Sequence, residues 1–225
     1  KRYDKASKLM KTGEKKCKEE CAVLEKLLKH MEDGAPARTL ELSEEEKELV
    51  RGFSLLSMKP MIYAANVEED ALSGVENNAL VAQVRQAAQK EGAEVVVVSA
   101  KVEEELAQLE EEERTMFLNE LGLESAGLDR LVEASYRLLG LISYLTAGPK
   151  EVRAWTIEKG TKAPQAAGKI HSDFEKGFIR AEIVTYEDLV ACGSIAAARE
   201  KGLYRSEGKE YVIQDGDVVL FRFNV

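Results

Sequence analysis

Cysteine is rare in this chain, which has three in 225 residues, at positions 17, 21 and 192. A small, odd number of cysteines excludes a disulfide framework and is typical of proteins kept in a reducing cytoplasm. Cys17 and Cys21 lie four residues apart on a probable helix, where two thiolates could share a metal ion. Because no histidine or further cysteine lies close by, we expect partly buried helix residues instead.

Long apolar runs are also absent. No run approaches the roughly 18 residues of a membrane-spanning helix, and the N-terminus has no signal-peptide pattern. Hydrophobic residues make up 44% of the chain and charged residues 32%, which is ample apolar material for one large domain or two small ones. We therefore expect a globular cytoplasmic protein without a membrane partner.

The charge is unevenly distributed. The total is −9, yet residues 59–142 contain 17 Asp and Glu against 7 Lys and Arg, while the flanking segments are nearly neutral. The acidity of the whole chain therefore does not exclude a nucleic-acid partner. The first 18 residues hold eight Lys and Arg against two acids, a basic patch that most simply forms a solvated helix face.

Residues 1–58 are predicted to form a helical arm. Apolar residues recur every seven positions up to Met31, which predicts one helix of about 45 Å with a coiled-coil seam. A capping box at Ser43 and Glu46 begins a second helix that ends before Pro60. The seam residues are Tyr3, Met10, Cys17, Leu24 and Met31.

The second helix would be about half as long as the first, so it would leave part of the seam without a partner. We expect the partner to come from missing chain or from self-association through the exposed seam. The chain also starts in what resembles mid-helix, Lys1-Arg2-Tyr3-Asp4-Lys5, without an initiator Met. Both features predict a piece of a longer protein.

Residues 59–142 are predicted to form part of a doubly wound α/β sheet. Met61–Ala65 and Val95–Val98 are apolar runs typical of buried strands, and a helix over residues 78–91 separates them. Acidic helical sequence through Leu118, with Glu103–Glu105 on a solvated face, precedes an amphipathic helix at residues 128–141. Two strands are too few for such a sheet, so its remainder is expected upstream.

Residues 143–225 are predicted to form a small α+β domain. Strands are expected at residues 152–157 and 179–186 around a short helix at 165–171, with an Ala-rich helix at 186–201. The turn Asp215-Gly216-Asp217 lies between apolar runs and predicts a β-hairpin. A small sheet packed on one helix is the ubiquitin-like β-grasp arrangement.

Polar residues follow both predicted strands of the α/β part, as Asn66-Val67-Glu68-Glu69 and as Ser99-Ala100-Lys101. Ligands bind beyond the C-terminal ends of parallel strands, so both loops would face one crevice. An amide such as Asn66 suits a purine edge or the neighbouring loop, a carboxylate suits an exocyclic amine, and the Ala100 N–H could donate to a base. By themselves, these residues also fit a turn followed by a solvated acid.

Two runs in the last third of the chain are distinctive. They closely resemble the C-terminal TGS domain of the YchF subfamily of Obg-like P-loop ATPases, and the resemblance extends over the whole chain. It includes the Asn-x-x-Glu pattern of Asn66 and Glu69. The runs are Thr146-Ala147-Gly148-Pro149-Lys150-Glu151-Val152-Arg153-Ala154-Trp155-Thr156 and Gly160-Thr161-Lys162-Ala163-Pro164-Gln165-Ala166-Ala167-Gly168-Lys169-Ile170-His171-Ser172-Asp173-Phe174-Glu175-Lys176-Gly177-Phe178.

The resemblance implies a partial P-loop NTPase domain at residues 59–142 with an inserted coiled-coil arm at 1–58, followed by a β-grasp TGS domain at 143–225. It also implies that the intact protein binds ATP, and GTP more weakly, with Mg²⁺. Val67 occupies the position at which related GTPases carry a lysine that packs on guanine. The residues implied in base recognition are Asn66, Val67, Glu69, Ser99, Ala100 and Lys101.

No Gly-x-x-x-x-Gly-Lys-Ser/Thr pattern occurs in the printed sequence. Such a loop cradles the β- and γ-phosphates, and their placement is most of phosphoryl-transfer catalysis. This chain alone is therefore expected to be inactive, with slight affinity for nucleotide. The resemblance further implies that the arm and the TGS domain bind the ribosome or RNA.

Two other functions fit the same residues. In the first, the arm and TGS domain form a non-enzymatic RNA- or protein-binding module, and the α/β part is a scaffold. In the second, the protein is structural and self-associates. A basic group could contact RNA phosphates, whereas core packing accounts best for Trp155 and a structural role for His171. The basic group is Lys159, Lys162, Lys169, Lys176 and Arg180.

Overall fold

The computed structural model describes residues 2–10, 15–148 and 151–224. The chain divides into two compact units, residues 1–134 and 135–225. The division falls inside helix α7 (Gly127–Leu139). Each unit is described by itself.

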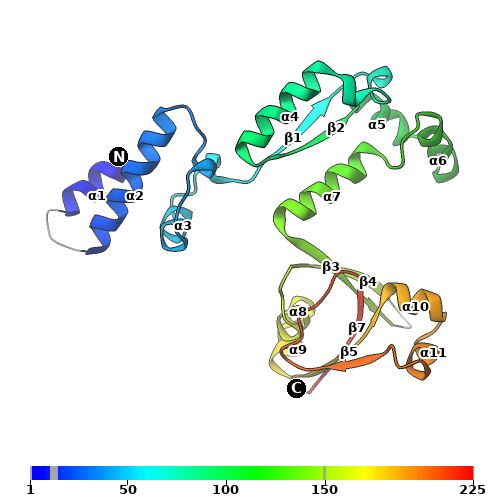
Figure 1. Cartoon of the computed structure of the whole chain (residues 1–225). Coiled ribbons are helices and arrows are strands. Elements are labelled where there is room, and N and C mark those ends of the chain that lie inside the picture. The colour runs from blue at the N-terminus through cyan, green and yellow to red at the C-terminus, as the bar shows by residue number, and fades with distance from the viewer. Residues whose placement is uncertain (1, 11–14, 149–150, 225) are drawn as a thin grey trace. The chain divides into compact units, whose positions relative to one another are not determined.

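The first unit begins with two helices, α1 (Arg2–Met10) and α2 (Lys15–Glu32), which pack against each other (Figure 1). Ala6 of α1 is buried in one cluster with Cys21 and Leu24 of α2. The prediction of a single helix of about 45 Å is therefore wrong. A seven-residue spacing marks an apolar stripe, but it does not tell whether the helix is continuous or folds back to cover that stripe.

Part of the predicted seam has its partner within the chain. Tyr3 packs on the cluster around Cys21, and its hydroxyl donates to Glu25 at 2.7 Å. Helix α1 thus covers the seam around Leu24, whereas Met31, near the end of α2, is 41% exposed.

Helix α3 (Glu44–Arg51) begins at the predicted capping box. The Ser43 hydroxyl accepts from the Glu46 N–H at 3.2 Å, and the Glu46 carboxylate accepts from the Ser43 N–H at 3.0 Å. The helix ends earlier than predicted, at Gly52. The short turns η1 (Ala37–Thr39) and η2 (Leu56–Met58) flank α3, and Val50 packs with α2 in a small core.

The predicted strand–helix–strand piece is present. Strand β1 (Ile62–Asn66) pairs in parallel with β2 (Glu94–Val98), and α4 (Ala79–Glu91) connects them. The Asn78 side chain caps α4, and Gly92 ends it with φ +65°. The prediction that β1 is a buried strand is wrong for the described chain, because β2 is its only paired neighbour there and Ala64 is exposed.

Three helices follow β2: α5 (Ala100–Leu106), α6 (Glu111–Glu120) and α7. The prediction that Glu103 lies on a solvated face is wrong. Its carboxylate accepts from the N–H groups of Gly127 at 2.7 Å and Leu128 at 3.1 Å, so it caps α7. A side chain at position 127 would start 2.8 Å from this carboxylate, which explains the glycine.

The second unit is built on a five-stranded sheet of order β4-β3-β7-β5-β6. The central strands β3 and β7 run parallel, and the other pairs are antiparallel. The predicted hairpin at Asp215–Asp217 is wrong, because β7 pairs with β5 and β3 instead. The strands are β3 (Leu141–Ala147), β4 (Val152–Glu158), β5 (Phe178–Thr185), β6 (Arg205–Glu207) and β7 (Asp217–Phe223).

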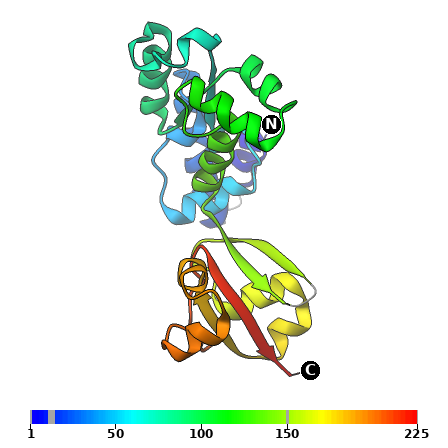
Figure 2. The ribbon, with the colours of Figure 1, turned by 90° about the vertical axis from the view of Figure 1, so that its right-hand side faces the viewer.

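Helices lie on both sides of β7 in Figure 2. Helices α8 (Ala163–Ile170) and α9 (Ser172–Lys176) cover the main core, where Tyr144 is fully buried. Helices α10 (Tyr186–Cys192) and α11 (Ile195–Glu200) replace the single predicted helix at 186–201. Gly193, with φ +73°, ends α10, and Ser194 caps α11.

Among the described residues, no helix combines the length and the apolar character of a membrane span.

Candidate functional site

The two loops after β1 and β2 are held together at the end of the parallel pair. Asn66 lies opposite Val98, and the Val67 N–H donates to the Val98 carbonyl at 2.9 Å. The Asn66 Oδ1 accepts from the Ala100 N–H at 2.9 Å. This bond makes Asn66 a link to the neighbouring loop, and it engages the N–H that the sequence suggested for base contact.

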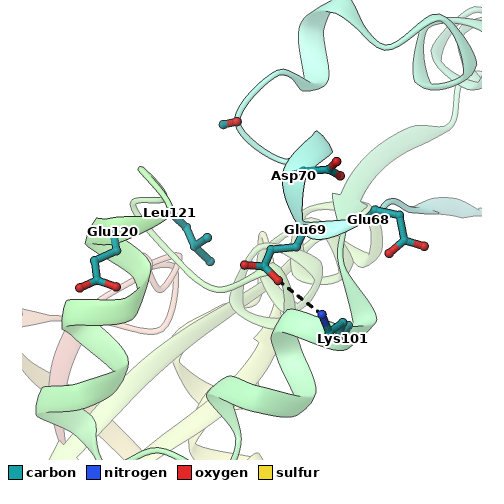
Figure 3. Close-up of a pocket in the computed structure, with 7 residues that line it drawn as sticks. Glu68, Glu69, Asp70, Lys101, Glu120 and Leu121 are labelled. Atoms are coloured by element: carbon teal, nitrogen blue, oxygen red, sulfur yellow. Dashed lines mark ion pairs between the residues drawn. The ribbon is translucent and has the colours of Figure 1, made fainter.

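Glu69, which follows β1, and Lys101, which follows β2, form an ion pair. Glu69 begins the short turn η3 (Glu69–Ala71), and Lys101 lies in the first turn of α5. Their carboxylate and ammonium groups are 3.6 Å apart (Figure 3). The side chains are 39% and 65% exposed, so the pair is weak in itself and both groups can reach a ligand.

A cavity of about 480 Å³ lies beside this ion pair, a size in the range of small-molecule sites. Glu120 and Leu121, at the end of α6, form its other wall (Figure 3). No local sequence pattern points to these two residues, because only the folded chain brings the end of α6 close to the loops. The complete lining is Glu68, Glu69, Asp70, Ser73, Lys101, Glu120 and Leu121.

The remaining predicted residues lie elsewhere around the loops. Ser99 is buried, and Val67 packs against the apolar cluster of Val102 and Leu106. Asn66 and Val67 line a second cavity of about 510 Å³, between the loop and α4. The structure thus joins Asn66 to Ala100 and Glu69 to Lys101, but it places Val67 in a different cavity from Glu69.

The charges of the first cavity limit what it can bind. Four carboxylates line it against one ammonium group, so the field disfavours phosphate groups there. Carboxylates accept hydrogen bonds from exocyclic amines, so the first cavity suits a neutral ligand that has an amino group. Asn66 lines the second cavity, where its amide nitrogen can donate to a ring nitrogen.

Two candidates of the second unit have structural roles. The Trp155 indole N–H donates to the Thr146 hydroxyl at 2.9 Å, and its ring packs against the main core. His171 caps α9, since its Nδ1 accepts from the Asp173 N–H at 3.2 Å. Within the described ranges, no group of three His, Cys, Asp or Glu residues is arranged to hold a metal ion.

Comparison with known proteins covers the whole chain. Residues 141–224 match the family model YchF-GTPase_C, described as "Protein of unknown function (DUF933)". "Ribosome-binding ATPase YchF" of Bacillus subtilis is 55% identical over 225 residues, 100% of this chain and 62% of that protein. The chain belongs to the YchF family.

Other YchF proteins agree with this assignment. The Escherichia coli O157:H7 protein of the same name is 52% identical over 98% of this chain and 60% of its own length. The solved Schizosaccharomyces pombe YchF GTPase matches with a TM-score of 0.81 and 37% identity, over 92% of this chain and 55% of that one. The chain thus spans about 60% of the length of the curated YchF relatives it matches.

Proposed function

We propose that this chain supplies the base-recognition end of the ATP site, and the ribosome-contacting domains, of a P-loop ATPase. Residues 59–142 are then the C-terminal part of the P-loop domain, residues 1–58 its helical arm, and residues 143–225 a β-grasp TGS domain. The order of the five-stranded sheet, with parallel central strands and one main helical layer, supports the β-grasp assignment.

The observation that carries the nucleotide assignment is the bond between Asn66 and Ala100, which fixes two loops at the C-terminal end of a parallel strand pair. Ligands bind at this end in open α/β sheets. With its oxygen engaged, the Asn66 amide presents N–H donors, which suit purine N7. Glu69, oriented by Lys101, accepts from an exocyclic amine such as that of adenine.

The triphosphate belongs to another part of the site. The acidic cavity beside Glu69 disfavours phosphates, and the printed sequence has no phosphate-binding loop. Bound Mg²⁺ would neutralise charge on the β- and γ-phosphates in the intact protein. Phosphate placement and catalysis are therefore assigned to the part of the protein outside this chain, with ATP preferred and GTP bound more weakly.

The partner assignment rests on the relatives, which are named ribosome-binding ATPases. The arm and the TGS domain are the parts of this chain assigned to ribosome or RNA contact. A cytoplasmic location agrees with this partner. Co-sedimentation of the full-length protein with ribosomes, with and without ATP, tests the assignment, and binding without any nucleotide would favour a pure binding module.

The hydrogen bond that joins the Asn66 side chain to the Ala100 N–H gives a direct test of base recognition. Asn66→Ala in the full-length protein removes one base donor and the bond to Ala100, so ATP affinity is expected to fall about tenfold, the equivalent of ~1.4 kcal/mol. Titration calorimetry measures the change. Gln86→Ala removes an amide from the exposed face of α4 and should leave affinity unchanged. Equal affinities for wild type and Asn66→Ala would contradict the assignment.

A further inference from the structure

The five-stranded sheet of the second unit has two very different edges. At one edge, β6 is three residues long and begins and ends with a charged side chain. At the other edge, β4 has seven residues and pairs regularly with β3 over its whole length. Proteins usually protect a sheet edge with a short strand, a proline, a bulge or charges. The β6 edge has such protection, whereas β4 contains neither a proline nor a bulge.

The hydrogen bonds at the two ends of the β3–β4 pair show which backbone groups of β4 face outward. The Gly148 N–H donates to the Glu151 carbonyl at 2.9 Å, and the Lys159 N–H donates to the Gly140 carbonyl at 2.7 Å. In an antiparallel pair, residues that are bonded to the neighbouring strand alternate with residues that are not. The odd-numbered residues of β4 are therefore bonded to β3, and the even-numbered residues turn their N–H and C=O groups away from it.

Three of the outward-facing residues have unpaired backbone groups. The Glu158 carbonyl accepts from the Thr161 N–H at 3.1 Å, but no described residue bonds to the outward backbone groups of Val152, Ala154 or Thr156. Val152 is 71% exposed, and Ala154 is exposed as well. A row of unpaired N–H and C=O groups is a template for an added strand.

These unpaired groups are arranged symmetrically about Ala154. If a second copy of β4 pairs in the antiparallel direction with the two Ala154 residues opposite each other, Val152 of each copy lies opposite Thr156 of the other. Both backbone groups of all three residues are then bonded. Any other register leaves at least one of the three opposite Glu158 or beyond the end of the strand. The small Ala154 side chain also lets the two backbones approach at the symmetry axis.

The side chains on the other face of β4 match in the same register. Arg153 of each copy lies opposite Trp155 of the other, at a non-hydrogen-bonded position, where side chains come closest. Within one chain, the Arg153 guanidinium already lies over the Trp155 ring at 4.2 Å, and the Arg153 side chain is 55% exposed. Pairing thus brings each guanidinium near a second indole ring, a favourable cation–π geometry, and puts no like charges directly opposite each other.

We infer that β4 is the interface of a homodimer, in which the β4 strands of two copies pair in the antiparallel direction about Ala154 and form one continuous sheet. Such an interface uses the same surface of both copies, so it closes at two copies. The match of the unpaired groups and of Arg153 with Trp155 favours a second copy over an unrelated strand. The inference concerns self-association, which goes beyond the proposed nucleotide and ribosome binding, and it uses a different surface from the helical seam.

Charges placed at the symmetry axis test this dimer. A contact between two short strands is small, so the full-length protein should dimerise with a Kd of roughly 10–100 μM in sedimentation velocity runs. Ala154→Lys puts two ammonium groups opposite each other and Ala154→Glu two carboxylates, so each variant alone should associate at least about tenfold more weakly. An equimolar mixture of both variants should associate within about threefold of wild type, because each lysine then faces a glutamate.

Met31→Lys is the matched control, because it adds the same charge at an exposed position of the first unit and should leave self-association unchanged. If Ala154→Lys does not fold, Ala154→Pro tests the same edge. The Ala154 N–H faces outward, so proline removes no bond to β3, yet it removes a donor from the interface and should also weaken association about tenfold.

Four results would overturn the inference. They are a monomer at every protein concentration, association of Ala154→Lys as tight as that of wild type, a mixture that associates no better than either charged variant alone, and an equal loss of association in Met31→Lys.

Cysteine cross-linking reads the register directly. Under mild oxidation, Ala154→Cys should give a disulfide-linked dimer, because Cα atoms of a hydrogen-bonded antiparallel pair are about 5.5 Å apart, within reach of a disulfide. Val152→Cys is the matched control, since the two copies of position 152 would be about 14 Å apart. Wild type, with its own free cysteines, gives the background. Cross-linking of Val152→Cys as fast as that of Ala154→Cys would overturn the register.

Discussion

Replacement of Glu182 by alanine is expected to lower the free energy of unfolding of the second unit by about 3 kcal/mol, because loss of one partner leaves the others of a buried charge network unpaired. The buried carboxylate accepts from Arg180, Arg199, Arg222 and Tyr204, which together with Glu182 form the arginine cluster. The estimate is at the low end for buried pairs, since the half-exposed arginines can turn toward water. Urea unfolding followed by Trp155 fluorescence measures the change.

Glu200→Ala is the matched control, because it removes a carboxylate from the exposed end of α11 and should change stability by less than about 0.5 kcal/mol.

The stability that Glu182 contributes should also depend on pH. The hydrogen bonds from Arg222 and its neighbours lower the pKa of Glu182 to about 2. A lowered folded-state pKa means that the stabilisation is present above the unfolded pKa of about 4.5 and is lost as the pH falls from there toward 2.

Glu182→Gln should lack that acid-dependent part of the stability. Urea midpoints of wild type and variant at pH 6 and pH 3 measure the difference, which should narrow at the lower pH. The arginine cluster would not stabilise the sheet if the urea midpoints of wild type and Glu182→Gln changed equally between pH 6 and pH 3. The same would follow if Glu182→Ala were as stable as wild type.

The second large effect is expected at Gly177, just before β5. A methyl group there would lie 2.0 Å from the backbone oxygen of Asn224, at the end of β7. The same pair forms the bond from the Asn224 N–H to the Gly177 carbonyl, at 2.9 Å. Gly177→Ala must therefore displace main chain, at a cost of about 2 kcal/mol.

Gly208→Ala is the control for this substitution, because a methyl group at position 208 has no atom within 4 Å and φ is not in the positive region. Thermal unfolding of the two variants gives the comparison. Equal melting temperatures of Gly177→Ala and Gly208→Ala would contradict the close approach of Gly177 to the backbone of Asn224.

Local signals in the sequence predicted the elements that depend on neighbours in the chain. The capping box at Ser43 and the Gly92 end of α4 are examples, because their hydrogen bonds join residues a few positions apart. The run Val95–Val98 was correctly predicted as a strand for a similar reason: its β-branched residues suit a pleated surface.

The errors arose where distant residues decide the structure. Asp215-Gly216-Asp217 has hairpin chemistry, yet Asp215 accepts from the Ser143 N–H and β7 continues to β5, far away in the sequence. The heptad pattern was satisfied by a fold-back of α1 onto α2. At the site, the sequence indicated both loops and offered the neighbouring loop as one partner for Asn66, as the bond to Ala100 shows. It did not indicate the wall from Glu120.

The arginine cluster shows the same limit. Its members come from positions 180, 182, 199, 204 and 222, and only Arg180 stood out beforehand. In sequence, Glu182 is one acid in a strand. Its role follows from the β5–β7 register and the position of α11, which no local pattern specifies.

The measurement that tests the central proposal most directly is calorimetric titration of ATP and GTP, with Mg²⁺, into the full-length protein, with this chain as the control. We expect tighter binding of ATP than of GTP by the full-length protein, and at most slight binding by this chain, whose printed sequence has no phosphate-binding loop. Tighter binding of GTP, or no nucleotide binding by the full-length protein, would contradict it.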